Sequence, residues 1–378
     1  MKDPFSFGRL LAMMIKELIQ LRRDRLTFAM MVGIPIIQMT LFGFAINGDP
    51  RELPTAVVAQ EQGPFTRSLV RALENSGYFK VVAPAADTAQ AERMIALGEV
   101  QFVFTIPAGF ERALLRGEHP ALLLEADATD PSATGNAIGA VQQLASSALR
   151  HDLVGALAPP GNGSPPFDWQ IHRRYNPEGI TQYNIVPGLM GVILTMTMIM
   201  MTALAVTREV ERGTMENLLA TPVHPLEVMV GKIGPYIAIG YVQVSIILLA
   251  ARYVFNVPFE GNLALLLLGV LIFIGASLTV GITISSVAQS QMQAMQMTFF
   301  FFLPSLLLSG FMFPFRGMPG WAQFIGEALP LTHFLRVIRG VMLKGSDWSA
   351  VWPHIWPLLV FTAVVLGIGL KRFRRTLD

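Results

Sequence analysis

The longest uncharged stretch of the chain, residues 261–315, contains no Asp, Glu, Lys or Arg in 55 residues. A helix needs about 20 apolar residues to cross the hydrocarbon core of a bilayer, so this stretch is too long for a single crossing. It suits two crossings joined at the polar segment 285–293, which reads SSVAQSQMQ. Because a soluble core rarely uses so long an uncharged segment, the stretch predicts a membrane protein.

Four further intervals lack the same charged residues: 26–48, 179–207, 233–251 and 348–370, the last carrying only His354. Only 14% of the whole chain is charged, against a usual share of about 25%. The first interval exceeds the roughly 7–15 apolar residues of a signal peptide, so we predict an uncleaved first span. The sequence therefore predicts a polytopic α-helical membrane protein with six transmembrane helices, at 26–48, 184–207, 231–251, 262–286, 293–313 and 350–370.

Lysines and arginines in short flanks predict the orientation of these helices. Basic residues are frequent in 1–25, in the loop 208–230 and in the tail 371–378, which share one side if there are six spans. We therefore expect both termini to be cytoplasmic. The segment 314–347 weakens the contrast, because it should lie on the other side and yet carries four basic residues: Arg316, Arg336, Arg339 and Lys344.

The segment before the first span has an apolar face formed by Leu11, Met14, Ile15 and Leu18. This spacing favours an amphipathic helix, residues 1–25, on the inner surface of the membrane. A plain N-terminal extension of the first span is the alternative.

Residues 49–178 form one large insert between the first two spans, and the orientation places it outside the cytoplasm. Strand-like runs at 55–59, 79–83, 101–106 and 121–126 alternate with helical patterns at 65–75, 88–97, 109–116 and 132–157. Such alternation predicts an extracytoplasmic α/β domain with a largely parallel sheet. The segment 158–167, APPGNGSPPF, is typical of a flexible connection back to the membrane.

No catalytic site is evident. Asp127 and Asp130 flank Thr129 before a proline, and turn formation explains them better than a cation site. There is no cysteine, the histidines lack ligand spacing, and no nucleotide-binding or hydrolase motif occurs. We therefore expect no enzyme activity and no cofactor in this chain. The basic residues lie beside apolar segments, which suits membrane flanks and lipids rather than nucleic acid.

The predicted spans contain almost no ionisable groups, and His354 lies near the outer end of the last one. Ion-coupled carriers usually need buried acids or histidines, and many channels need charged rings, so both classes are disfavoured. If the protein pumps, its energy must come from a partner.

The loop after the second span reads REVERGTMENLLATP at 208–222. Thr214 can cap a short helix with Glu216 in its first turn, where the helix dipole favours an anion. Met215, Leu218 and Leu219 form one apolar face of that helix. An exposed two-turn amphipathic helix needs a partner groove, although packing of the loop on the membrane surface is the alternative.

This loop resembles the corresponding loop of ABC-2 permeases of ABC transporters, and the resemblance covers essentially the whole chain. IPAGFERALLRGE at 106–118, YNPEGITQYNIVPGLMG at 175–191, LPSLLLSGFMFP at 303–314 and LPLTHFLRVIRGVMLKG at 329–345 follow in the same order as in that family. The chain is most similar to the bacterial multidrug-type subgroup that carries this inserted domain.

The resemblance implies an exporter subunit of the bacterial inner membrane. Two permease chains, identical or paralogous, would pair with two cytoplasmic ATPase subunits that bind ATP and Mg, and a periplasmic adaptor could join them. The residues carried over as the coupling element, together with the apolar face above, are Glu209, Glu211, Arg212, Gly213, Thr214, Met215, Glu216, Leu218 and Leu219. The segment 314–347 would form re-entrant or interfacial helices at the outer leaflet.

The substrate route would then run near the second and fifth spans, with Met196, Met200, Phe299 and Phe302 as candidate lining residues. Methionines suit adaptable surfaces, whereas consecutive phenylalanines point all around a helix and favour lipid contact or packing. Apolar walls favour drug-like or lipid-like substrates. A membrane-anchored sensor or scaffold is the rival function, but such a protein needs only one or two spans.

Overall fold

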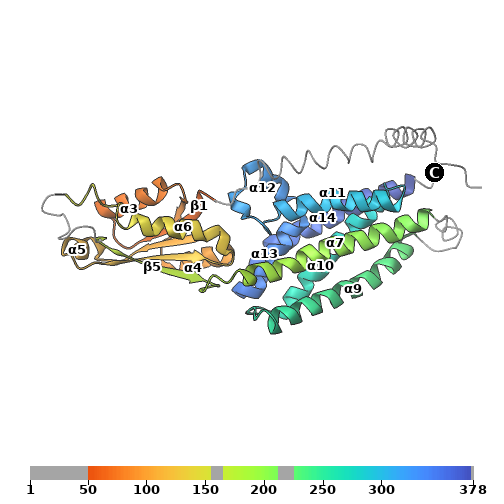
Figure 1. Cartoon of the computed structure of the whole chain (residues 1–378), viewed down its shortest axis with the longest axis horizontal. Helices are drawn as coiled ribbons and strands as arrows, with labels where there is room; N and C mark the ends of the chain where they lie inside the picture. Colours follow the sequence, from red (N-terminus) through yellow and green to blue (C-terminus); the bar gives the residue numbers. More distant parts are fainter. Residues whose placement is uncertain (1–49, 155–164, 212–224, 376–378) are drawn as a thin grey trace, which may run out of the picture.

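The computed structural model describes residues 50–154, 165–211 and 225–375. An α/β domain lies at one end of the elongated molecule, and a bundle of long helices forms the rest (Figure 1). The predicted helix 1–25, the predicted span 26–48 and most of the predicted coupling loop lie outside the described residues.

The sheet of the α/β domain has five strands in the order β2-β1-β3-β4-β5. Its strands are β1 (Leu53–Ala59), β2 (Phe79–Pro84), β3 (Phe102–Ile106), β4 (Ala121–Asp127) and β5 (Asp168–Arg174). All neighbouring pairs are parallel except β3 and β4, so the predicted largely parallel sheet is confirmed. The prediction missed β5, whose sequence DWQIHRR is mostly polar because this edge strand buries only part of one face.

Helices cover both faces of the sheet: α3 (Pro64–Asn75), α4 (Thr88–Leu97), α5 (Phe110–Leu115) and α6 (Pro131–Leu144). Successive side chains of β1 point to opposite faces of the sheet. Leu53 and Val57 belong to the larger core with α3 and α6, whereas Ala56 and Val58 pack with Ile95 of α4. The Asp87 carboxylate caps the start of α4 by accepting a hydrogen bond from the backbone N–H of Gln90 at 2.7 Å.

The predicted helix 132–157 is too long. α6 ends at Leu144, and residues 145–153 form turns and a bend. The hydroxyls of Ser146 and Ser147 donate to the Gln143 carbonyl at 2.9 and 3.4 Å, which competes with the hydrogen bonds that would continue the helix. Leu149 and Leu153 remain buried, so the apolar pattern that suggested a helix serves packing in this segment.

The bundle contains α7 (Thr181–Glu211), α9 (Pro225–Tyr253), α10 (Leu263–Ser285), α11 (Gln291–Leu308) and α14 (Trp348–Arg375). By length and composition, four helices in the described part are suited to cross a membrane: α7, α9, α10 and α14. α11 is not among them, and its three glutamines, Gln291, Gln293 and Gln296, make its first two turns polar. The protein is thus a helical membrane protein, and its full set of six spans stays a prediction.

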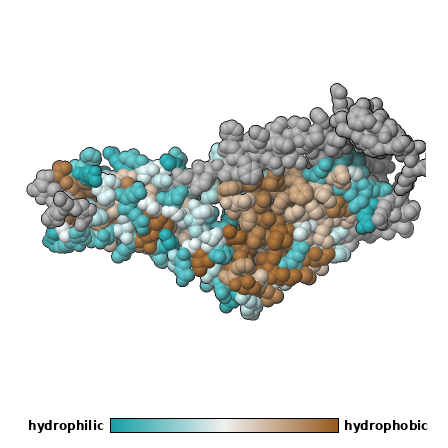
Figure 2. Space-filling model, in the orientation of Figure 1, coloured by the Kyte–Doolittle hydropathy of each residue, from teal (hydrophilic) through white to brown (hydrophobic). Residues whose placement is uncertain are grey.

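α10 is the central helix, since it packs against α7, α9, α13 and α14. The helices come close where a glycine leaves room: a Cβ at Gly281 would lie 2.7 Å from the Ile199 carbonyl oxygen of α7. The hydroxyls of Thr195 and Thr202 donate to carbonyls of their own helix, which satisfies them in this apolar interior. Figure 2 shows apolar surface gathered over the bundle, between more hydrophilic surfaces at its two ends.

Between α11 and α14 the chain forms a 3-10 turn (Phe315–Gly317) and two helices, α12 (Gly320–Glu327) and α13 (Pro330–Lys344). These elements lie at the end of the bundle that faces the α/β domain (Figure 1). α13 is largely buried, with Leu331, Phe334 and Ile338 fully inside.

The connection from β5 to α7 covers only residues 175–180, and Asn176 braces it. The buried Asn176 side chain accepts from the Ile180 amide at 2.9 Å and donates to the Ile180 carbonyl at 3.0 Å. The edge strand of the sheet therefore continues into the first long helix of the bundle through a short, internally bonded joint.

Candidate functional site

The predicted coupling element begins at the end of the bundle remote from the α/β domain (Figure 1). Glu209 and Glu211 lie in the last turn of α7, and the Glu211 carboxylate accepts from the Gln291 amide at 2.8 Å and from its side-chain nitrogen at 2.6 Å. This contact joins the end of α7 to the start of α11. The remaining predicted coupling residues lie outside the described ones: Arg212, Gly213, Thr214, Met215, Glu216, Leu218 and Leu219.

The four predicted substrate-path residues lie on two neighbouring helices, since α7 packs against α11. Met196 and Met200 are half-buried on α7. On α11, Phe299 is 44% exposed and Phe302 only 9% exposed, so the two rings face different surroundings. Their role in a substrate path stays a prediction.

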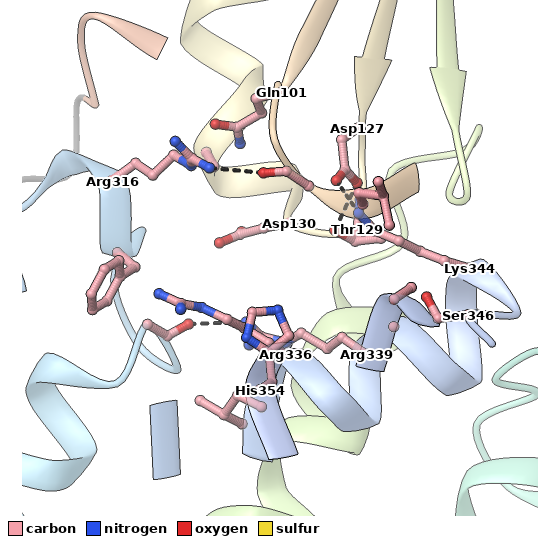
Figure 3. Close-up of a pocket in the computed structure, with 18 of the residues that line it drawn as sticks. Gln101, Asp127, Thr129, Asp130, Arg316, Arg336, Arg339, Lys344, Ser346 and His354 are labelled. Carbon is pink, nitrogen blue, oxygen red and sulfur yellow. Dashed lines mark hydrogen bonds and ion pairs between the residues drawn. The ribbon is translucent and has the colours of Figure 1, made fainter. Parts of the chain in front are cut away.

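A cavity of about 370 Å³ lies where the α/β domain meets the bundle (Figure 3). One wall comes from the end of α4, the segment just before β3 and the β4–α6 turn. The other comes from the segment after α11, the 3-10 turn, α12, α13 and α14. Seven charged side chains line it: Asp127, Asp130, Arg316, Glu327, Arg336, Arg339 and Lys344. The four basic residues that weakened the predicted orientation thus meet in one place.

Lys344 and Asp127 form an ion pair across the two domains. Each side chain is only 11% exposed, and the Lys344 ammonium also lies 5.2 Å from the centre of the Tyr175 ring. The other Asp127 oxygen accepts from the Thr129 amide and hydroxyl, at 3.1 and 2.8 Å. The predicted turn role of Asp127 is therefore confirmed, and its long-range partner is new.

Two basic side chains of the bundle also donate hydrogen bonds to carbonyl groups at the end of α4. Arg316 donates to the Gly98 carbonyl at 2.8 Å, and Lys344 donates to the Ile95 carbonyl at 3.4 Å. Cations suit this position because the last carbonyls of a helix carry partial negative charge. Burial lowers the pKa of Arg316, and the positive charge of Arg336 lowers it further.

Asn184 and Arg339 extend the contact between the domains. Asn184 of α7 donates to the Thr129 carbonyl at 2.9 Å and accepts from Arg339 at 2.8 Å. Arg339 also donates to the Gly310 carbonyl at 3.0 Å, at the end of α11. The interface is thus built largely from hydrogen bonds and charges.

Glu327 binds Arg336 through both carboxylate oxygens, and the Arg336 guanidinium lies 4.8 Å from the centre of the Phe315 ring. Burial raises the pKa of Glu327, but the hydrogen bonds and charge of Arg336 outweigh it, so the pKa lies below its ordinary value. Asp130 caps α6 by accepting from the Ser132 amide at 3.1 Å, which confirms its predicted turn role. Within the described ranges, no group of three or more His, Asp or Glu could hold a metal ion.

Comparison of the sequence with known proteins shows the family of this chain. The sequence model described as "ABC-2 family transporter protein" matches residues 25–371. The probable multidrug ABC transporter permease YbhR of Escherichia coli is 29% identical over 98% of this chain and 99% of its own length. YbhS, of the same description and organism, is 27% identical over the full length of both chains. The inner membrane transport permease YhhJ is 28% identical over 96% of each.

No solved structure matches the chain. The match to the family model covers the whole α/β domain and the described helices of the bundle as far as residue 371, near the end of α14. The relatives are membrane transport subunits rather than enzymes, and the same holds for this chain. The chain belongs to the ABC-2 family of transporter proteins, as a permease.

Proposed function

We propose that this chain is the membrane subunit of an exporter that moves a hydrophobic or amphiphilic substrate out of the cytoplasm or the inner leaflet. A separate ATPase subunit, present in two copies, hydrolyses the ATP. Two permease chains, identical or paralogous, form the path. The single observation that carries the proposal is the match, along nearly the full length, to permeases named for multidrug transport.

The composition of the bundle supports an external energy source. Residues 181–207, 234–251, 263–285 and 348–369 contain no Asp, Glu, Lys or Arg. Ion-coupled transport uses buried ionisable residues as relays, and these ranges supply only His354, near the outer end of α14. The rival function as a sensor or scaffold is not favoured, because the relatives named above are permeases.

The arrangement of the coupling end supports docking of the ATPase there. α7 and α9 enter and leave the loop 212–224 at the end remote from the α/β domain (Figure 1). In the proposed orientation this end faces the cytoplasm, and the α/β domain lies outside the cell membrane in the periplasm, where an adaptor could reach it. The last turns of α14 lie at the same end of the bundle as the ends of α7 and α9 that border this loop (Figure 1).

The test is a pull-down of the tagged full chain from its native host, with co-purifying proteins identified by mass spectrometry. Glu216→Lys reverses a charge in the predicted coupling helix, so it should insert normally but recover much less ATPase. Glu74→Lys, an exposed reversal on α3, serves as the matched control and should recover the wild-type amount. Wild-type ATPase recovery and transport by Glu216→Lys would contradict the proposed coupling role, and loss in both variants would show a nonspecific effect.

A further inference from the structure

The cavity between the two domains contains more positive charge than its carboxylates neutralise. Lys344 is paired with Asp127, and Arg336 is paired with Glu327. The third carboxylate, Asp130, caps α6, and its negative charge also stabilises the Arg339 guanidinium. Four basic side chains therefore face three carboxylates in the lining.

Two arginines of the lining remain, Arg316 and Arg339. Within the part of the chain that the structure describes, both donate only to neutral oxygens, at Gly98, Gly310 and Asn184. Arginines that line one cavity and donate to no carboxylate favour a bound anion, because a guanidinium presents several donors to one group of oxygens.

Buried polar atoms in the same lining also lack partners. The Nε of Arg339 and the Oε1 of Gln101 are buried, and neither has a hydrogen-bond partner among the described residues. Figure 3 shows Gln101 on the α/β side of the cavity, Arg316 reaching toward that side from the bundle, and Arg336 and Arg339 below them. A buried donor and a buried acceptor each cost free energy when left unpaired, so a ligand that satisfies both is favoured.

We infer that this cavity binds a phosphate ester that carries a neighbouring hydroxyl. Arg316 and Arg339 hold the phosphate oxygens, and the hydroxyl donates to Gln101. A ligand with only a carboxylate would accept hydrogen bonds from the arginines, but it would have no hydrogen to donate to the side-chain oxygen of Gln101. The volume of about 370 Å³ falls in the range of small-ligand pockets and is ample for such a headgroup.

Exposed aromatic residues lie on the elements that form the bundle side of the cavity. Trp321 and Phe324 are 42% and 81% exposed on α12, and Trp352 is 44% exposed on α14. Tryptophan is enriched at the level of membrane headgroups, where its ring is partly apolar and partly hydrated. With the membrane placement proposed above, on which this step rests, the headgroup of a single-chain lipid or similar amphiphile enters the cavity while its tail stays among these rings.

The experiment uses the purified full chain in a neutral maltoside detergent, with binding measured by isothermal titration calorimetry. The probes are lysophosphatidic acid, which has a phosphate and a neighbouring hydroxyl, inorganic phosphate, and an uncharged monoacylglycerol of the same chain length. Lysophosphatidic acid should bind, and the monoacylglycerol should bind much more weakly. Additional binding of inorganic phosphate would show that the free anion suffices, whereas binding of the lipid alone would identify a headgroup site.

Arg316→Gln removes one charged donor and should weaken binding of lysophosphatidic acid about 10- to 100-fold. Arg252→Gln, at an exposed arginine at the end of α9, is the matched control and should bind as the wild type does. Arg316 also donates a hydrogen bond to the Gly98 carbonyl, so Arg316→Gln could weaken binding by disturbing the interface between the domains. Gln101→Leu is therefore the second variant. It removes the unpaired Gln101 side-chain oxygen and should weaken binding of lysophosphatidic acid about fivefold.

Equal affinity of the wild type, Arg316→Gln and Gln101→Leu would overturn the site, as would equal binding of the uncharged lipid. The assay contains no ATPase and no ATP. Failure of the binding site therefore leaves the exporter proposal standing, and failure of the pull-down leaves this site standing.

Discussion

The ion pair between Lys344 and Asp127 should be the strongest single link between the α/β domain and the bundle. Breaking a buried pair by removing one partner typically costs about 3–5 kcal/mol, because a charge is left without compensation. Both side chains here keep 11% exposure, and Asp127 retains its two hydrogen bonds from Thr129, so the lower end applies. We expect Lys344→Met to destabilise the docked arrangement by about 3 kcal/mol, or a factor of about 100 in its equilibrium constant.

The assay takes advantage of the absence of cysteine from the sequence. Spin labels at Arg93→Cys on α4 and Tyr253→Cys at the end of α9, both exposed positions, report the distance between the domains. In Lys344→Met we expect a broader distance distribution and a lower melting temperature.

Lys80→Met is the control, because it breaks an ion pair with Glu52 within the α/β domain whose side chains are 61% and 73% exposed. Exposed pairs contribute about 0–1 kcal/mol, so neither observable should change much. An unchanged distance distribution together with an unchanged melting temperature in Lys344→Met would refute the reasoning.

Three further predictions concern packing and pH. Gly281→Ala should lower the melting temperature by forcing α7 and α10 apart, at a cost of about 1–3 kcal/mol, whereas Gly275→Ala, with no atom within 4 Å of its added Cβ, should be neutral or slightly stabilising. The pKa of Glu327 lies below its ordinary value, so its stabilising effect is complete above about pH 4.5 and should be lost as pH falls through the folded-state pKa; Glu327→Gln should flatten a plot of melting temperature against pH in that window, and an unchanged slope would contradict the pairing. Phe302→Ala should cost about 3 kcal/mol because its ring is buried, whereas Phe299→Ala should cost less than about 1 kcal/mol because its ring is exposed; the reverse order in thermal unfolding would contradict this reasoning.

The long apolar helices could be predicted from the sequence because their cause is local. A helix in lipid must satisfy its own backbone and must be long and uncharged, so composition alone marks α7, α10 and α14. The alternating elements of the α/β domain follow from periodicity in the same way. The edge strand β5 could not be found by this reasoning, because only Trp169 and Ile171 of its seven residues pack on the core.

The cavity between the domains could not be predicted, because its contacts join distant parts of the chain. Lys344 and Asp127 are 217 residues apart, and Arg339 and Asn184 are 155 apart. The available signal was indirect: four basic residues stood on the side where few are expected. These residues cluster because two of them contact the α/β domain: Arg316 and Lys344 donate to the end of α4, and Lys344 also pairs with Asp127 at the end of β4. The sequence gives no sign that these segments meet.

The braced joint at Asn176 makes α7 a mechanical link along the molecule. With 31 residues at 1.5 Å each, this helix is about 46 Å long, and it runs from the edge strand of the sheet to the start of the coupling loop. Because the joint is internally bonded, β5 should move with α7 rather than hinge freely on it. A tilt of about 5° around one end of such a rod displaces the other by about 4 Å. A small tilt of α7 about its loop end would therefore move its sheet end by more than the length of a hydrogen bond, which is enough to break the polar contacts between the α/β domain and the bundle.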